Sequence, residues 1–180
     1  VHNGDVFLFM SIDYPYVSST LPYTNAIEWI EERLDRYKGA RFFIFMHFPP
    51  SGYSGLLEGQ YYGFSNDSVQ DDELITMLNK TKNATVFHGH SHYSFDIEKH
   101  ADALNIYKFN SSHVNLIHVP SINYVRNENS ESNWDVAQGF LVDVYDKGFV
   151  VTGVDLLAGT EMKEHEYIIT IDNNPDPISN

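Results

Sequence analysis

Histidines follow two of the apolar segments of this sequence. His47 follows one such segment, and His90 and His92 follow another in the element Gly89-His90-Ser91-His92. A single histidine after a buried strand is most often a satisfied core residue. Two imidazoles two residues apart can face one site, however, and Gly89 lets the backbone approach that site closely. The sequence therefore predicts a shared metal site formed by His47, His90 and His92.

Other assignments of these residues fit the sequence less well. The metallo-β-lactamase-like signature His-x-His-x-Asp-His requires aspartate and histidine where this chain has Ser94 and Phe95. The segment before His88 does not resemble the start of an amidohydrolase barrel. His88 itself is interpreted as a strand-end residue. Asp96, four residues after His92, is a candidate to accept a hydrogen bond from a ligating imidazole and so to orient it.

Composition narrows the possible chemistry. The chain has 180 residues, no cysteine and a formal net charge of -14. Without cysteine, any metal must be held by histidine, carboxylate or amide groups. The acidic surface disfavours binding to a nucleic-acid polymer, and no apolar run approaches the roughly 18 residues of a membrane helix. The lack of cysteine and four Asn-x-Ser/Thr triplets lean toward an extracytoplasmic or secreted protein but leave localisation unknown.

The pattern of apolar residues predicts the elements that position the histidines. Helices are predicted at 25–37 and 68–78, and strands at 6–12, 41–46, 84–87, 114–119, 139–145, 149–156 and 166–171. The alternation in the first half indicates an α/β layered fold with reactive groups at the carboxyl ends of strands. The second half indicates an antiparallel sheet, with a hairpin turn at 146–148. We expect one domain over 1–172 and a disordered tail over 173–180.

Two further segments bear on function. Asn3-Gly4 is a strong hairpin-turn signal with only two residues before it, so we expect its partner strand to precede this chain in a longer protein; a frayed N-terminal turn is the alternative. The segment 51–66 has no periodicity and is predicted to be a long loop. Its tyrosines, Tyr53, Tyr61 and Tyr62, could line a substrate pocket, although surface packing is the commoner role of loop tyrosines.

A family resemblance becomes specific at the two histidine elements. Phe42-Phe43-Ile44-Phe45-Met46-His47-Phe48-Pro49-Pro50, followed about forty residues later by Phe87-His88-Gly89-His90-Ser91-His92, resembles the last two motifs of the calcineurin-like metallophosphoesterases. That superfamily includes purple acid phosphatases and cyclic-nucleotide phosphodiesterases. The order of predicted elements, from a strand ending near Asp13 to Val119-Pro120-Ser121 and the closing strands, is similar as well. The resemblance thus covers nearly the whole chain.

The resemblance implies the C-terminal half of a layered α/β sandwich and a two-metal site. In that family an aspartate and a solvent-derived hydroxide bridge two cations, which can be manganese, iron or zinc. By match of motif, His47 and His90 would bind one cation and His92 the other. The implied activity is hydrolysis of a small phosphoester or a nucleotide, as a phosphatase or phosphodiesterase.

Three earlier motifs of the family are absent from these residues: Asp-x-His, Gly-Asp-x-x-Asp and Gly-Asn-His-Asp/Glu. Gly4-Asp5 lacks the second aspartate and is better interpreted as part of the hairpin turn. The missing motifs supply the bridging carboxylate, the amide ligand and the histidine that assists the leaving group. We therefore expect an active full-length enzyme and a nearly inactive isolated chain. The alternatives are a non-catalytic binding domain with the same fold and a single-metal hydrolase that uses only these histidines.

Overall fold

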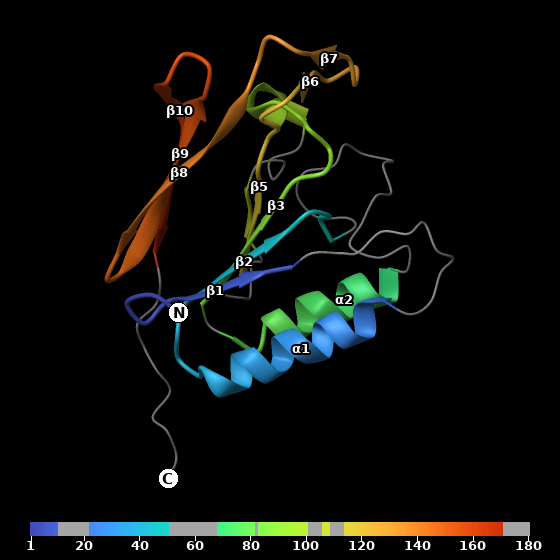
Figure 1. Cartoon of the computed structure of the whole chain (residues 1–180), viewed down its shortest axis with the longest axis vertical. Helices are drawn as coiled ribbons and strands as arrows, with labels where there is room; N and C mark the ends of the chain where they lie inside the picture. The colour runs from blue at the N-terminus through green and yellow to red at the C-terminus, as the bar shows by residue number, and fades with distance from the viewer. Residues whose placement is uncertain (11–21, 51–67, 82, 101–105, 109–113, 171–180) are drawn as a thin grey trace.

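The computed structural model describes residues 1–10, 22–50, 68–81, 83–100, 106–108 and 114–170. Figure 1 shows a twisted sheet with two helices on one face and a second, antiparallel sheet on the other. The predicted α/β character and an antiparallel sheet in the second half are therefore confirmed, and the more specific phosphoesterase sandwich stays a prediction. The strand predicted at 114–119 as part of the antiparallel half belongs instead to the first sheet, where it pairs parallel with the strand that precedes Gly89. No described helix is long and apolar enough to cross a membrane.

The first sheet has five strands in the order β1-β2-β3-β5-β4. These strands span Val6–Phe9 (β1), Phe42–Met46 (β2), Ala84–His88 (β3), Val114–His118 (β5) and Ile106–Lys108 (β4). The first four run parallel, and β4 pairs antiparallel with β5. β2, β3 and β5 are apolar throughout because helices cover one face of the sheet and the second sheet covers the other.

Helices α1 (Pro22–Arg36) and α2 (Ser68–Leu78) cover one face of this sheet. Ile30 and Leu34 of α1, with Leu74 and Leu78 of α2, are buried against it. They meet alternate residues of the strands, among them Ile44. Side chains four residues apart lie on the same side of a helix, so these four leucines and isoleucines form the apolar stripes that attach both helices to the sheet.

The second sheet packs on the opposite face. Its strands are β8 (Gln138–Tyr145), β9 (Gly148–Asp155) and β10 (Thr160–Thr170), in the order β10-β9-β8. Phe43 and Phe87 of the first sheet meet Phe149 and Val151 of β9. The Phe43 and Phe149 rings lie 5.3 Å apart in an edge-on arrangement. This aromatic layer holds the two sheets together.

The two turns expected from sequence are present. His2 and Asp5 exchange two backbone hydrogen bonds of 2.9 Å across Asn3-Gly4, both of which have positive φ. The second turn connects β8 to β9, with Tyr145 paired to Gly148. Residue 13, the 51–66 segment with its tyrosines, and the 173–180 tail lie outside the described residues.

Some short elements were not predicted. These are β4, β6 (Val125–Arg126), β7 (Ser132–Asn133) and the 3-10 helix η1 (Phe95–His100). Strand β7 falls inside the segment 127–133, which its polar composition assigns to a loop. Strand β10 begins six residues before the predicted strand at 166, and a bulge between Met162 and Glu166 interrupts its pairing with β9. The bulge interrupts the alternation of apolar and polar residues from which a strand is predicted.

Candidate metal centre

The carboxyl ends of three neighbouring strands place the histidine elements at one edge of the first sheet. Met46, His88 and His118 are partners in register across β2, β3 and β5. His47 follows β2 directly, and its carbonyl oxygen accepts a 3.1 Å hydrogen bond from the Gly89 backbone nitrogen. The parallel register therefore brings His47 close to the segment after β3, as the sequence predicts.

His47 and His90 are in contact. The Nε2 atom of His47 lies 3.1 Å from Nδ1 of His90, and the two rings are nearly perpendicular, at 79°. At this separation one imidazole donates a hydrogen bond to the other. Two nitrogens bound at about 2.1 Å to one cation in neighbouring coordination positions would also stand about 3.0 to 3.4 Å apart, depending on the coordination angle. This pair therefore has the spacing of two ligands of one metal ion.

The backbone holds the histidines after β3 in an unusual conformation. His90 has φ of 76° and His92 has φ of 64°. Non-glycine residues adopt positive φ only at a cost in free energy, and such positions are concentrated at functional sites. The two left-handed residues lie on either side of Ser91, which is buried, and both histidines are partly exposed.

His92 is oriented by the segment before β6. Its Nδ1 atom donates a 3.2 Å hydrogen bond to the Tyr124 carbonyl oxygen, and its ring stacks on the Tyr124 ring at 4.4 Å. The Arg126 backbone nitrogen in turn donates to the His92 carbonyl oxygen at 2.7 Å. Because Nδ1 carries the hydrogen, Nε2 of the neutral ring has its lone pair free for a ligand.

The surroundings keep the paired imidazoles neutral at pH 7. Burial lowers the pKa of His90 to about 4, with further lowering from the positive charges of His47, His92 and Arg126. Burial also lowers the pKa of His47, and His92 contributes to the same direction. Only the neutral imidazole can donate a lone pair to a cation, so these shifts favour metal binding.

The described part of the chain nevertheless contains no group of three or more His, Asp or Glu residues arranged to hold one metal ion. It supplies a two-nitrogen pair, His47 and His90, with His92 close enough for its charge to act on both. This set suits part of a metal site, and the pair alone would leave most coordination positions of a cation to other ligands.

Asp96 and His88 occupy other positions. The Asp96 carboxylate accepts a hydrogen bond from the Ser94 hydroxyl at 3.1 Å and lies 3.8 Å from Nε2 of His165. The acceptor that meets His92 is instead the Tyr124 carbonyl oxygen, a backbone atom that leaves no signal in a sequence. His88 is buried at the end of β3, in agreement with its interpretation as a strand-end residue.

Sequence reasoning also missed Arg126 and Trp134. The Arg126 guanidinium lies 5.7 Å from the centre of the Tyr124 ring, and the Trp134 ring lies 4.7 Å from it. Both residues come from short segments without periodicity. A cationic residue near the candidate histidines in the sequence would have pointed to this site. Arg126 gives no such signal, because it lies 34 residues after His92.

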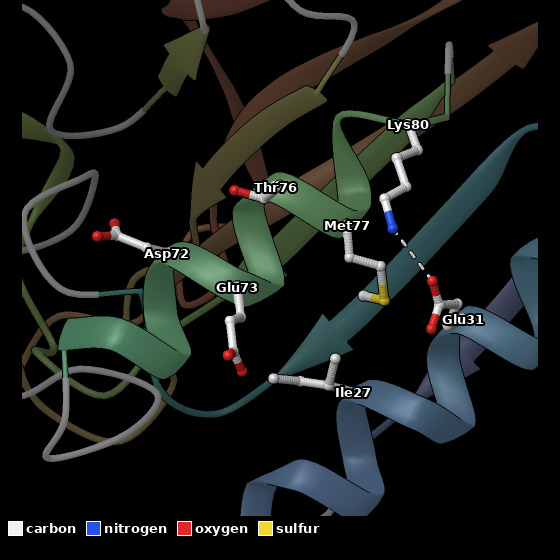
Figure 2. Close-up of a pocket in the computed structure, with 7 residues that line it drawn as sticks. All are labelled: Ile27, Glu31, Asp72, Glu73, Thr76, Met77 and Lys80. Carbon is white, nitrogen blue, oxygen red and sulfur yellow. Dashed lines mark hydrogen bonds and ion pairs between the residues drawn. The ribbon is translucent and has the colours of Figure 1, made fainter.

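One described cavity lies away from the histidines, between α1 and α2. It has a volume of about 420 Å³ and is lined by Ile27, Glu31, Asp72, Glu73, Thr76, Met77 and Lys80. Figure 2 shows the Lys80 ammonium reaching across it to the Glu31 carboxylate, at 3.2 Å. Its lining contains no histidine and resembles an ordinary groove between two surface helices, so the cavity is not the candidate site.

Comparison with models of known protein families and with curated proteins finds no match to this chain. The functional interpretation therefore depends on the histidines and their surroundings.

Proposed function

We propose that this chain is the C-terminal part of a metal-dependent phosphoester hydrolase, a phosphatase or phosphodiesterase with a two-metal site. The observation that carries the proposal is the 3.1 Å separation of the His47 and His90 ring nitrogens at the carboxyl edge of the parallel sheet. The lowered pKa of both imidazoles and the free Nε2 of His92 support it.

In this proposal His47 and His90 hold one cation and His92 holds a second. Bound cations of this kind lower the pKa of a bridging water and neutralise the charge of a phosphoryl group. The three histidines of this chain would hold the cations through their ring nitrogens, and the Tyr124 carbonyl oxygen fixes the ring of His92. The carboxylate ligands and the bridging aspartate belong, in this proposal, to an upstream part of the same domain.

The substrate in this proposal is a small phosphoester. A net charge of -14 would repel a nucleic-acid polymer. Positive charge at the site itself would come from the bound cations and from Arg126, which is close enough to His90 to lower its pKa.

The test uses the full-length protein supplied with manganese. We expect bound transition metal, hydrolysis of p-nitrophenyl phosphate or its bis-ester, and a loss of at least ~100-fold in kcat/KM in His90→Ala, because a ligand is removed. The matched control is His2→Ala, which changes an exposed histidine in the turn before β1. A full-length protein without bound metal and without activity on either ester would favour the non-catalytic binding domain.

A further inference from the structure

A continuous run of aromatic rings extends from the candidate site to the surface. The His92 ring stacks on Tyr124 with centroids 4.4 Å apart and planes at 29°. The Tyr124 ring in turn meets Trp134, with centroids 4.7 Å apart and planes at 44°. Because the two separations are consecutive, the Trp134 ring lies no further than about 9 Å from the His92 ring.

Trp134 is 65% exposed although it packs on Tyr124. A single exposed apolar side chain is ordinary on a protein surface. The position of this one is specific, because one side of the indole meets a ring that itself stacks on a candidate metal ligand. Tryptophan presents a large rigid surface with only two side-chain torsions, so it can bind a flat ligand at a low cost in conformational entropy.

Arg126 adds a positive charge beside the same rings. Its guanidinium lies 5.7 Å from the centre of the Tyr124 ring. Within the described part of the chain its Nε atom is buried and has no hydrogen-bond acceptor. A planar guanidinium with an unused donor is suited to the oxygens of a phosphoryl group.

We propose that Trp134, held in place by the Tyr124 ring, forms a stacking subsite for a planar ring carried by the phosphoester, with Arg126 directed at the phosphoryl oxygens. The substrate class is then an aromatic or heteroaromatic phosphoester, either an aryl ester or a mononucleotide. This inference rests on the proposed function, because the histidine site must hold the phosphoryl group for the ring to reach Trp134. The span of at most about 9 Å suits a substituent attached close to the phosphorus.

The experiment measures binding by calorimetry to the manganese-loaded full-length protein. The non-hydrolysable phosphonate analogue of AMP is compared with that of ribose 5-phosphate, which has the sugar without the base, and phenylphosphonate is compared with methylphosphonate. We expect the ring-bearing member of at least one pair to bind about ten-fold more tightly, a difference of ~1.4 kcal/mol that lies within the range for stacking of a base on an aromatic side chain. The pair that shows the preference identifies the source of the ring.

Trp134→Ala should remove this preference by weakening the ring-bearing ligand about ten-fold, with the ring-free ligand unchanged. Trp134→Phe should retain most of it. The control is Trp29→Ala, which removes an indole on α1 that lies under the Arg33 guanidinium, and which should alter neither ligand. Equal binding of both ligands to the wild type, or equal weakening of both by Trp134→Ala, would overturn the subsite.

Hydrolysis of glycerol 2-phosphate by the same preparations separates the two proposals. An enzyme that hydrolyses this ring-free ester but shows no ring preference has the proposed function without the stacking subsite. A protein that hydrolyses neither this ester, nor p-nitrophenyl phosphate, nor its bis-ester lacks the proposed function, and the subsite fails with it.

Discussion

Arg41 and Asp5 form a two-pronged ion pair at the edge of the parallel sheet. Nε of Arg41 donates to Oδ1 of Asp5 at 2.7 Å, and Nη2 donates to Oδ2 at 2.6 Å. The third nitrogen, Nη1, donates to the carbonyl oxygens of Tyr145 and Gly148, at 2.7 and 3.3 Å. One guanidinium thus joins the turn before β1, the start of β2 and the hairpin between β8 and β9.

Removing one member of this pair should destabilise the fold. The two side chains are only 14% and 13% exposed, so Asp5→Asn leaves a largely buried positive charge without its counter-charge. We expect the free energy of unfolding to fall by about 3 kcal/mol, measured by urea denaturation. Asp5→Asn combined with Arg41→Met should lose less than the two single changes added together.

An exposed ion pair provides the control for this experiment. Lys38 and Asp35 lie 3.3 Å apart with side chains 79% and 70% exposed. Lys38→Met should change the free energy of unfolding by less than about 0.5 kcal/mol, because water already solvates both charges. An Asp5→Asn effect as small as this control would show that the buried pair does not join the sheets.

The central strands could be predicted from the sequence because strands that are buried on both faces consist of consecutive apolar residues. β2 and β3 lie between two layers, so each is a short continuous apolar run, and the histidines follow where each run ends. The ion pair of Arg41 with Asp5 was not predictable, since 36 residues separate its members and either could have faced solvent.

The prediction of the site was incomplete for a similar reason. That His47 and His90 meet follows from two parallel strands ending at the same level. The orientation of His92 depends on the Tyr124 carbonyl oxygen and on the two-residue strand β6, which pairs with β7 and forms a single bridge to Tyr93. Contacts made by backbone atoms of irregular segments depend on φ and ψ. They cannot be recognised from the pattern of side chains in the sequence.

Two buried histidines predict loss of stability in acid. Burial lowers the pKa of His118 to about 3, with a further contribution from the charge of His92. Burial also lowers the pKa of His88 well below its usual value, and the charge of His118 adds to that shift. The unfolded chain binds protons at these positions below about pH 6.5, whereas the folded chain does not.

Stability from these groups is therefore fully present above pH 6.5 and is lost as the pH falls from 6.5 toward about 3. We expect the free energy of unfolding to fall by a few kcal/mol between pH 7 and pH 4, measured by urea denaturation at each pH. His118→Asn, which removes the titrating ring beside Ser91, should flatten this dependence. An unchanged slope in that variant would assign the acid sensitivity to other groups.

The separation of the His47 and His90 nitrogens predicts that the two residues act as a unit in binding metal. His47→Ala and His90→Ala should each weaken zinc binding by the full-length protein at least ~10-fold, measured by calorimetry. The double variant should bind little more weakly than the worse single variant, because each change already breaks the same site. Losses that add fully would place the two imidazoles on different cations.

At Gly148, the first residue of β9, the backbone of β10 leaves no space for a side chain. A Cβ atom at this position would overlap the Ile169 carbonyl oxygen and lie 3.2 Å from the Thr170 Cα, both of them backbone atoms of β10. Rotation of a side chain cannot relieve such contacts, so β9 and β10 would have to separate locally. The Gly148 carbonyl oxygen also accepts a hydrogen bond from Arg41, which couples this strain to the ion pair at the sheet edge.

We therefore expect Gly148→Ala to lower the free energy of unfolding by about 2 kcal/mol, at the cost usual for an atom inserted into a filled site. Gly139→Ala on β8 is the matched control, because a Cβ there meets only the side chain of Leu156, which is exposed and can move. That variant should stay within about 0.5 kcal/mol of the wild type. Thermal unfolding of both variants measures the difference, and equal midpoints would show that β10 yields to the added methyl group.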